Sequence, residues 1–160
     1  MSQHTAKIAW RRAEPGFLEG RYSREHTWSF DGGLSVAASS SPAVVRAPYS
    51  NPANIDPEEA FVASISSCHM LTFLHVARLA GFQVDSYEDE AVGHTTPNER
   101  RVPWVSAVTL SPRITYGGER RPTPDEESRL HHQAHDGCFI AQSVKTEITV
   151  TGVAPAAQAT

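Results

Sequence analysis

A long apolar segment in the middle of the chain limits most strongly what this sequence can fold into. Residues 57–80 are mostly apolar and stand between two helix-boundary signals. Asp56, Pro57 and Glu59 form a capping sequence of the D-x-x-E type before the segment. Gly81 follows it as a natural residue for ending a helix. A helix of this length would be about 36 Å long and apolar nearly all round, so it must be covered on most sides.

The length of the chain makes that cover difficult to supply from one subunit. The 160 residues fit a single domain, 1–160, with a core over about 20–152 and loose ends, the C-terminal one rich in alanine. A domain of this size has little material to wrap such a helix. We therefore expect a homodimer that sandwiches it. Serines and two histidines interrupt the apolar segment, which favours a buried helix over a membrane span.

Composition excludes several other classes of protein. Hydrophobic residues make up 39% and charged residues 20%, as in an ordinary globular protein. The net charge is −4 and no basic stripe is present, which argues against nucleic-acid binding. The N-terminal residues MSQHTAKIAWRRAEPG lack the apolar stretch of an export signal, so we expect a cytoplasmic protein. Two cysteines in that setting do not predict a structural disulfide framework.

The remaining sequence patterns predict short strands and one further helix. A hairpin is expected around the turn Asp31-Gly32-Gly33, and Thr123 to Glu126 read as a second helix start that runs to about Gly137. The expected strands are 25–30, 34–38, 83–92, 104–110, 113–116 and 145–151, with a loop over 93–103 whose role the sequence does not indicate. Strands with short connections and two separated helices favour an α+β fold on antiparallel sheet.

Cys68 lies deep inside the first expected helix. A thiol in an apolar helix is commonly an inert core residue. The helix dipole acts only within the first turn, so a reactive Cys68 would need a nearby cation to lower its pKa. Arg24, Arg21 and His75 are the candidates, and arginine is the better one because it stays charged and offers several donors.

Cys138 ends the second expected helix and is the only other thiol. By itself it also fits an inert core position. A low-pKa thiolate with a resolving thiol nearby is the arrangement that a thiol peroxidase needs. The sequence thus leaves two interpretations open. Cys68 and Cys138 are either a redox pair or inert core cysteines of a non-catalytic, stress-related dimer.

A zinc-binding module is the rival interpretation. His131, His135 and Cys138 recur at helical spacing on one face of the second helix. Together with Cys68 they could make a site of two histidines and two cysteines. The spacing matches no recognised zinc ribbon or finger.

Glu58 is an acid in the first turn of the long helix, where it complements the helix N-terminus. It stands about 15 Å from Cys68 along a straight helix, too far for contact within one chain. In a symmetric dimer, the helix start of one subunit could approach the middle of its partner's helix.

These residues together carry a family resemblance. The stretch NPANIDPEEAFVASISSCHMLTFLHVARLAGFQVDSYEDEAVG resembles the first-cysteine segment of the OsmC/Ohr family, the osmotically inducible and organic-hydroperoxide-resistance proteins. LHHQAHDGCFIAQSVKTEITV is similar to the family's second-cysteine segment, and YSREHTWSFDGG to the N-terminal hairpin of one OsmC-like subgroup. The resemblance spans roughly residues 20–150. It implies an intertwined homodimer in which two antiparallel sheets wrap a pair of long central helices.

The resemblance also implies a chemistry. It makes Cys68 the peroxidatic thiolate, Cys138 the resolving thiol, and Glu58 the acid that holds an arginine over the thiolate. Arg24 is the expected arginine and Arg21 the reserve. The implied activity is reduction of organic hydroperoxides, with hydrogen peroxide as an alternative substrate, without metal, flavin or haem. The implied partner is a dithiol reductant: a small thiol, a lipoyl group or a thioredoxin-like protein. His69 and the segment SREHTWSF depart from the hydroperoxide-resistance branch, which leaves the branch open.

Overall fold

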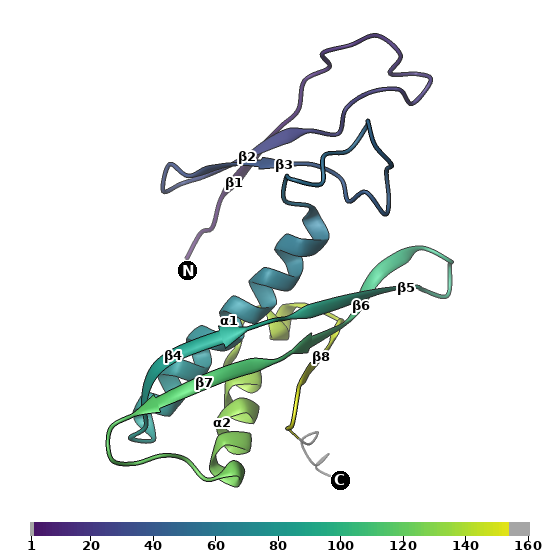
Figure 1. Cartoon of the computed structure of the whole chain (residues 1–160). Helices are drawn as coiled ribbons and strands as arrows, with labels where there is room; N and C mark the ends of the chain where they lie inside the picture. The colour runs from purple at the N-terminus through teal and green to yellow at the C-terminus, as the bar shows by residue number, and fades with distance from the viewer. Residues whose placement is uncertain (1, 154–160) are drawn as a thin grey trace. The chain divides into compact units, whose positions relative to one another are not determined.

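The computed structural model describes residues 2–153 of the chain (Figure 1). The chain divides after Ala60 into two compact units. They are called here the N-terminal unit, up to Ala60, and the C-terminal unit, from Phe61 onward. Most of the alanine-rich tail lies outside the described residues.

The N-terminal unit holds one three-stranded antiparallel sheet, in the order β1-β2-β3. Its strands are β1 (Ala6–Ala9), β2 (His26–Phe30) and β3 (Ser35–Ala38). Gly33 closes the β2–β3 turn with a φ of 86°, a conformation that glycine adopts without strain, and its N–H bonds the carbonyl of Phe30 at 3.0 Å. The predicted hairpin is confirmed. β1 adds an edge strand, pairing with β2 along its whole length.

The helix α1 (Pro57–Leu79) begins where the sequence predicts. The Asp56 carboxylate accepts the N–H of Glu59 at 2.8 Å, and the Glu59 carboxylate accepts the N–H of Asp56 at 3.1 Å. This reciprocal pair is the expected capping box. Gly81, at a φ of 80°, ends the helix by donating its N–H to the carbonyl of Arg78.

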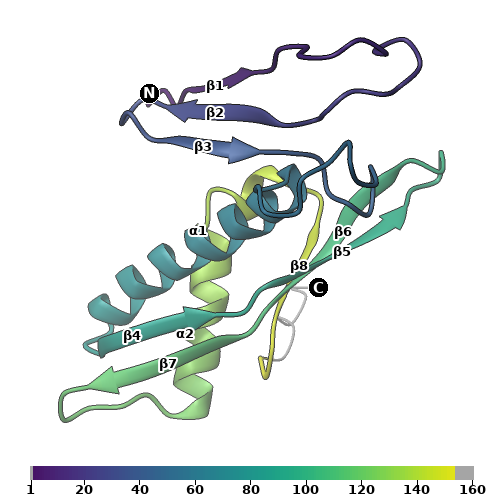
Figure 2. The same cartoon turned by 45° about the horizontal axis from the view of Figure 1, so that its top comes forward.

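The C-terminal unit combines two helices with two small sheets (Figures 1 and 2). One sheet is the antiparallel pair β4–β7, and the other has the order β5-β6-β8. The elements are β4 (Gln83–Asp89), β5 (Val92–Pro97), β6 (Pro103–Leu110), β7 (Pro112–Gly117), α2 (Pro124–Gly137), the 3₁₀ turn η1 (Ala141–Ser143) and β8 (Glu147–Val150). The fold is mixed α+β, as predicted, and α2 begins with the predicted capping box at Thr123.

Three sheet expectations are wrong in detail. Residues 83–92 do not form one strand, because β4 ends at Asp89 and β5 starts at Val92; the Asp89 carboxylate accepts the Ser111 N–H at 2.6 Å and the Ser66 hydroxyl. Most of the expected loop at 93–103 belongs to β5 and the start of β6. All six residues of β5 are exposed, so no apolar alternation marks this strand in the sequence. β8 pairs parallel with β6, whereas the sequence favoured antiparallel sheet throughout.

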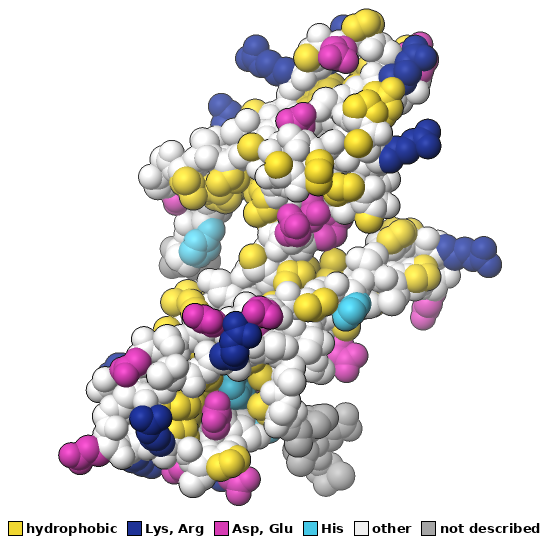
Figure 3. All heavy atoms as spheres, viewed as in Figure 1, with side chains coloured by type: hydrophobic (Ala, Val, Ile, Leu, Met, Phe, Trp, Pro, Cys, Tyr) yellow, Lys and Arg dark blue, Asp and Glu magenta, His cyan; other side chains and the backbone are white. Residues whose placement is uncertain are grey.

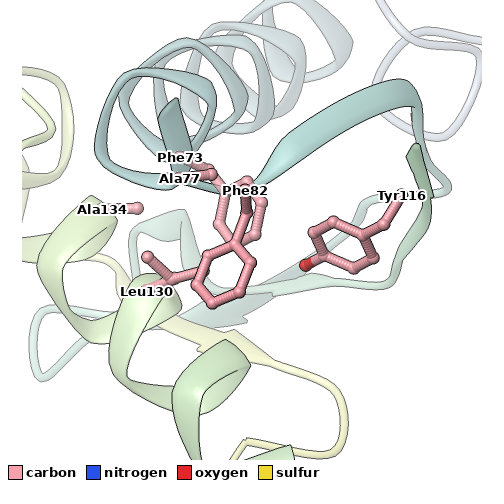
Figure 4. Packing of buried hydrophobic residues seen from close by; sticks show 6 residues of the cluster. All are labelled: Phe73, Ala77, Phe82, Tyr116, Leu130 and Ala134. Atoms are coloured by element: carbon pink, nitrogen blue, oxygen red, sulfur yellow. The ribbon is translucent and has the colours of Figure 1, made fainter. Parts of the chain in front are cut away.

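The core of the C-terminal unit is built on one stripe of α1. Ile65, His69, Phe73 and Ala77 recur every four residues and are all buried. One apolar cluster joins the two helices to β7 and to the turn before β4 (Figure 4); its buried members are Phe73, Ala77, Phe82, Tyr116, Leu130 and Ala134. A second cluster places Ile65 against the β6 residues Val108 and Leu110.

The rest of α1 is less covered than a helix so apolar requires. Leu71 is 61% exposed and Leu79 is 65% exposed. By length and composition α1 could cross a membrane, and 22% of its apolar window is buried. A core helix of a folded domain meets the same criteria, and α1 does carry the buried stripe. The single chain leaves much of the apolar surface of α1 uncovered, as the sequence led us to expect.

Candidate thiol site

The structure brings the two cysteines together inside the C-terminal unit. Cys68 lies in the middle of α1, and Cys138 is the C-cap residue of α2. Both are free thiols, and their side chains are hydrogen-bonded to each other. Two helices that are far apart in the sequence thus present one thiol each to the same place.

A glycine allows this close approach of the helices. A Cβ atom at Gly137 would lie 3.0 Å from Cγ2 of Thr72, a contact tighter than nearly all real ones. Thr72 stands one turn after Cys68 on α1 and donates its hydroxyl to the Cys68 carbonyl at 2.9 Å. Glycine at position 137 therefore lets the end of α2 press against α1 beside Cys68.

The two thiols differ in exposure, and the pKa of the buried one is shifted. Cys138 is fully buried, while Cys68 is half-buried. Burial, and next the hydrogen bond with Cys68, raise the pKa of Cys138 to about 11. At neutral pH Cys138 is therefore a protonated thiol that donates to Cys68. Of the two sulfurs, that of Cys68 is the one that meets solvent.

A pair of buried histidines lies beside this site. Nε2 of His69 and Nδ1 of His131 are 3.0 Å apart, and the rings are stacked with an interplanar angle of 8°. The exposed fractions of the two side chains are 1% and 3%. Burial lowers the pKa of each to about 4; His135 further lowers that of His69, and His69 that of His131, while Asp89 opposes the shift at His69. Both rings are neutral at pH 7.

Sequence reasoning treated His69 only as a departure from a family pattern and missed this pairing. The available signal was its spacing, because Ile65, His69 and Phe73 occupy successive positions of the buried stripe. The ring of Phe73 also lies 4.5 Å from that of His131.

The expected zinc arrangement is not found. Among residues 2–153, no group of three or more His, Cys, Asp or Glu side chains is arranged to hold a metal ion. His131 pairs with His69 and not with the thiols. The structure therefore gives no support to the site of Cys68, Cys138, His131 and His135 that helical spacing allowed, since the described residues place His131 against His69.

Three residues that the sequence assigned to the surroundings of the thiolate, Arg24, Arg21 and Glu58, lie in the N-terminal unit. The Arg24 guanidinium is stacked 3.7 Å from the centroid of the Tyr22 ring and donates to the carbonyls of Gly20, at 3.0 Å, and Tyr22. Arg24 is half-buried, whereas Arg21 and Glu58 are exposed. The expected roles of these three residues toward Cys68 stay predictions. His75, the remaining candidate cation, is exposed on α1.

The loop before α1 is tied to β2 by an acid that the sequence did not single out. Glu25 accepts from the side chains of Asn51 and Asn54 at 3.2 and 3.3 Å. The N–H of Arg24 bonds the carbonyl of Tyr49 at 2.9 Å. These bonds hold the backbone that carries Arg24 against the segment leading into α1.

The fold and the site together are those of an α+β protein that holds two neighbouring free thiols, one on each helix. The family profile of OsmC-like proteins matches residues 50–152, well over half of the chain. The chain belongs to the OsmC-like family.

Solved structures agree with this assignment. An OsmC-like protein of unknown function from Vibrio cholerae is 47% identical, with a TM-score of 0.90 over 94% of this chain and 98% of that one. An organic hydroperoxide resistance protein OsmC from Legionella pneumophila shares the fold at 16% identity, with a TM-score of 0.68 over 94% and 97% of the two chains. The organic hydroperoxide resistance protein OhrB of Bacillus subtilis does so at 16% identity and a TM-score of 0.64, over 93% and 96%. No curated protein matches the chain.

Proposed function

We propose that this protein is a thiol-dependent peroxidase that reduces organic hydroperoxides through Cys68 and Cys138. The observation that carries the proposal is the hydrogen-bonded pair of free thiols, one half-buried and one fully buried. Membership of the OsmC-like family supports it, because similar structures include hydroperoxide resistance proteins.

The chemistry divides between the two sulfurs. The Cys68 thiolate attacks the distal oxygen of ROOH, which breaks the O–O bond and leaves a Cys68 sulfenic acid and the alkoxide RO⁻. The alkoxide takes a proton from water to give the alcohol. The Cys138 thiol then displaces hydroxide from the sulfenic acid, forming the Cys68–Cys138 disulfide and water. An external dithiol reduces the disulfide. Sulfur carries the whole redox change, so no metal, flavin or haem takes part.

Attack on a peroxide requires a thiolate, and a nearby cation favours the thiolate over the thiol. We assign this role to Arg24, with Glu58 holding the guanidinium. The half-buried position of Arg24 supports the choice over the exposed Arg21.

Replacing Arg24 by alanine is expected to slow oxidation of Cys68 by roughly 10- to 1,000-fold at pH 7, since a nearby cation lowers a pKa by about 1–3 units. The rate is measured by stopped flow with cumene hydroperoxide, and the Cys68 pKa by the pH dependence of thiol alkylation. Arg21→Ala is the matched control, because it removes an exposed arginine three residues before Arg24. An Arg24→Ala variant that reacts as fast as the wild type, beside a slow Arg21→Ala variant, would transfer the role to Arg21.

Apolar side chains near Cys68 on α1 favour alkyl over inorganic peroxides. Met70 is half-buried and Leu71 is exposed, and we assign the substrate contacts to them. Phe61 is half-buried but packs against the second core cluster. Phe73 is fully buried in the core cluster and is not available to a substrate.

We further propose a cytoplasmic homodimer in which residues 1–160 act as one OsmC-like domain. Large apolar side chains of the C-terminal unit support the dimer, because Leu71, Leu79 and Phe139 are 61%, 65% and 83% exposed. Hydrophobic side chains reach the surface in several places in Figure 3. A second copy of the chain would cover them. Sedimentation equilibrium measures the mass, and a monomer at micromolar concentration would contradict this.

The first experiment is the intact mass of the reduced protein before and after one equivalent of cumene hydroperoxide. We expect a loss of two hydrogens, and a peptide map that links Cys68 to Cys138. An unchanged mass in folded, metal-free protein would overturn the peroxidase proposal and favour a dimer with inert cysteines. Slow thiol labelling that a chelator reverses would favour bound metal.

A further inference from the structure

The two sulfurs of the pair differ in how an external thiol can reach them. Cys138 is fully buried, whereas Cys68 keeps part of its surface exposed. A thiolate that opens a disulfide must reach the sulfur it attacks, in line with the bond that breaks. Only Cys68 meets this requirement. A route that admits a hydroperoxide to Cys68 admits a small thiol to the same sulfur.

The backbone after Cys138 is arranged to receive charge on its sulfur. The N–H of Ala141 donates to Sγ of Cys138 at 3.4 Å, and the N–H of Ile140 bonds the same sulfur. Ala141 is the first residue of η1, so its N–H has no partner inside that turn. A buried thiolate is unfavourable, and a buried thiol is a slow leaving group. By donating to the sulfur, the two N–H groups stabilise the buried thiolate and so make Cys138 a better leaving group.

We propose that reduction of the disulfide is directional: a small external thiol attacks Sγ of Cys68, and Cys138 leaves as a thiolate held by the backbone N–H groups of Ile140 and Ala141. The thiolate RS⁻ forms a bond to Sγ of Cys68 while the Cys68–Cys138 bond breaks, and its electron pair goes to Cys138. Cys138 then takes a proton from solvent. A second RS⁻ attacks the mixed disulfide on its R sulfur, which gives RSSR and returns the Cys68 thiolate.

The inference deepens the proposed function and rests on it for its role in a catalytic cycle. The direction of attack, however, can be tested without peroxide, because diamide oxidises neighbouring thiols directly. A disulfide that forms with diamide and not with cumene hydroperoxide would sink the peroxidase proposal and leave this test intact.

The test maps the mixed disulfide. Wild-type protein is oxidised with diamide, freed of the reagent, mixed with excess glutathione, and quenched with acid at early times. Remaining thiols are alkylated after denaturation, and the peptides are identified by mass. We expect glutathione on the peptide of Cys68 and the alkyl group on that of Cys138. Glutathione on Cys138 would overturn the proposal.

Two variants test the backbone donors. Ala141→Pro removes one N–H, and reduction by glutathione is expected to slow roughly tenfold, the effect of losing one hydrogen bond to a charged group. Ala141→Gly keeps the N–H and should stay within about twofold of the wild type. Proline disfavours the αR conformation of Ile140, so thermal unfolding checks the fold of that variant. Folded Ala141→Pro protein that is reduced at the wild-type rate would remove the N–H groups from the step, and the map on wild-type protein still decides the direction of attack.

Discussion

Replacing Cys68 by serine is expected to lower peroxide turnover by at least about a thousandfold, to the level of the uncatalysed reaction with the reductant. A hydroxyl does not ionise near neutral pH and does not form the sulfenic acid on which the cycle depends. Consumption of cumene hydroperoxide with excess dithiothreitol, followed by a peroxide-sensitive dye, measures the loss.

Cys138→Ser is the matched control for that experiment. Serine keeps a donor beside Cys68 and removes the resolving sulfur. Without dithiothreitol, we expect this variant to consume one equivalent of peroxide and to gain one oxygen on Cys68, which dimedone captures as a thioether. The reverse pattern, with oxygen on Cys138 or with full turnover in Cys68→Ser, would contradict the assigned order of the two thiols.

Acid is expected to destabilise the fold through the His69–His131 pair. The pKa of each ring is about 4 in the folded chain, against about 6.5 for an exposed histidine. The unfolded chain therefore binds more protons once the pH falls below about 6.5, and stability falls with pH until about pH 4, where the folded chain binds them too. Above pH 6.5 the rings are mainly neutral in both the folded and the unfolded chain, so they do not change the free energy of unfolding with pH. The expected loss between pH 7.5 and 5 is on the order of 2–4 kcal/mol for the two rings together.

Urea unfolding at a series of pH values and one protein concentration measures this loss, since oligomerisation makes stability depend on concentration. A double variant, His69→Gln with His131→Gln, has no titrating ring at the pair and should lose most of the pH dependence in this range. His75→Gln is the matched control on the exposed side of the same helix, and its pH dependence should equal that of the wild type. A double variant with an unchanged slope would show that other groups set the acid response.

The helix ends were predictable because their signals are local. Asp56 and Glu59 bond each other's backbone N–H within one turn, and Gly81 supplies the left-handed residue that ends α1. The β2–β3 hairpin was predictable for the same reason, since Gly33 sits in its turn. β5 escaped prediction because it is exposed on both faces, so its pairing with β6 leaves no apolar pattern.

For the candidate site, too, the sequence could predict which residues take part, but it could not predict which residues from distant parts of the chain lie next to them. Cys68 and Cys138 could be named from the sequence, but nothing in a sequence states which buried neighbours a side chain will meet. His131 shows the limit. Helical spacing grouped it with His135 and Cys138, whereas packing of α2 against α1 gave it His69 and Phe73 as neighbours.

Where the helices begin and end, which residues are thiols, and that α1 carries more apolar surface than one chain can cover could all be predicted from the sequence. These properties follow from interactions within a turn or from composition. Three further properties come from packing in the folded chain: the two thiols meet, Cys138 is the buried donor, and His69 pairs with His131. Each depends on the close contact of α1 with the end of α2, where Gly137 leaves room for Thr72. That contact joins residues far apart in the chain, and packing of the whole core sets its geometry.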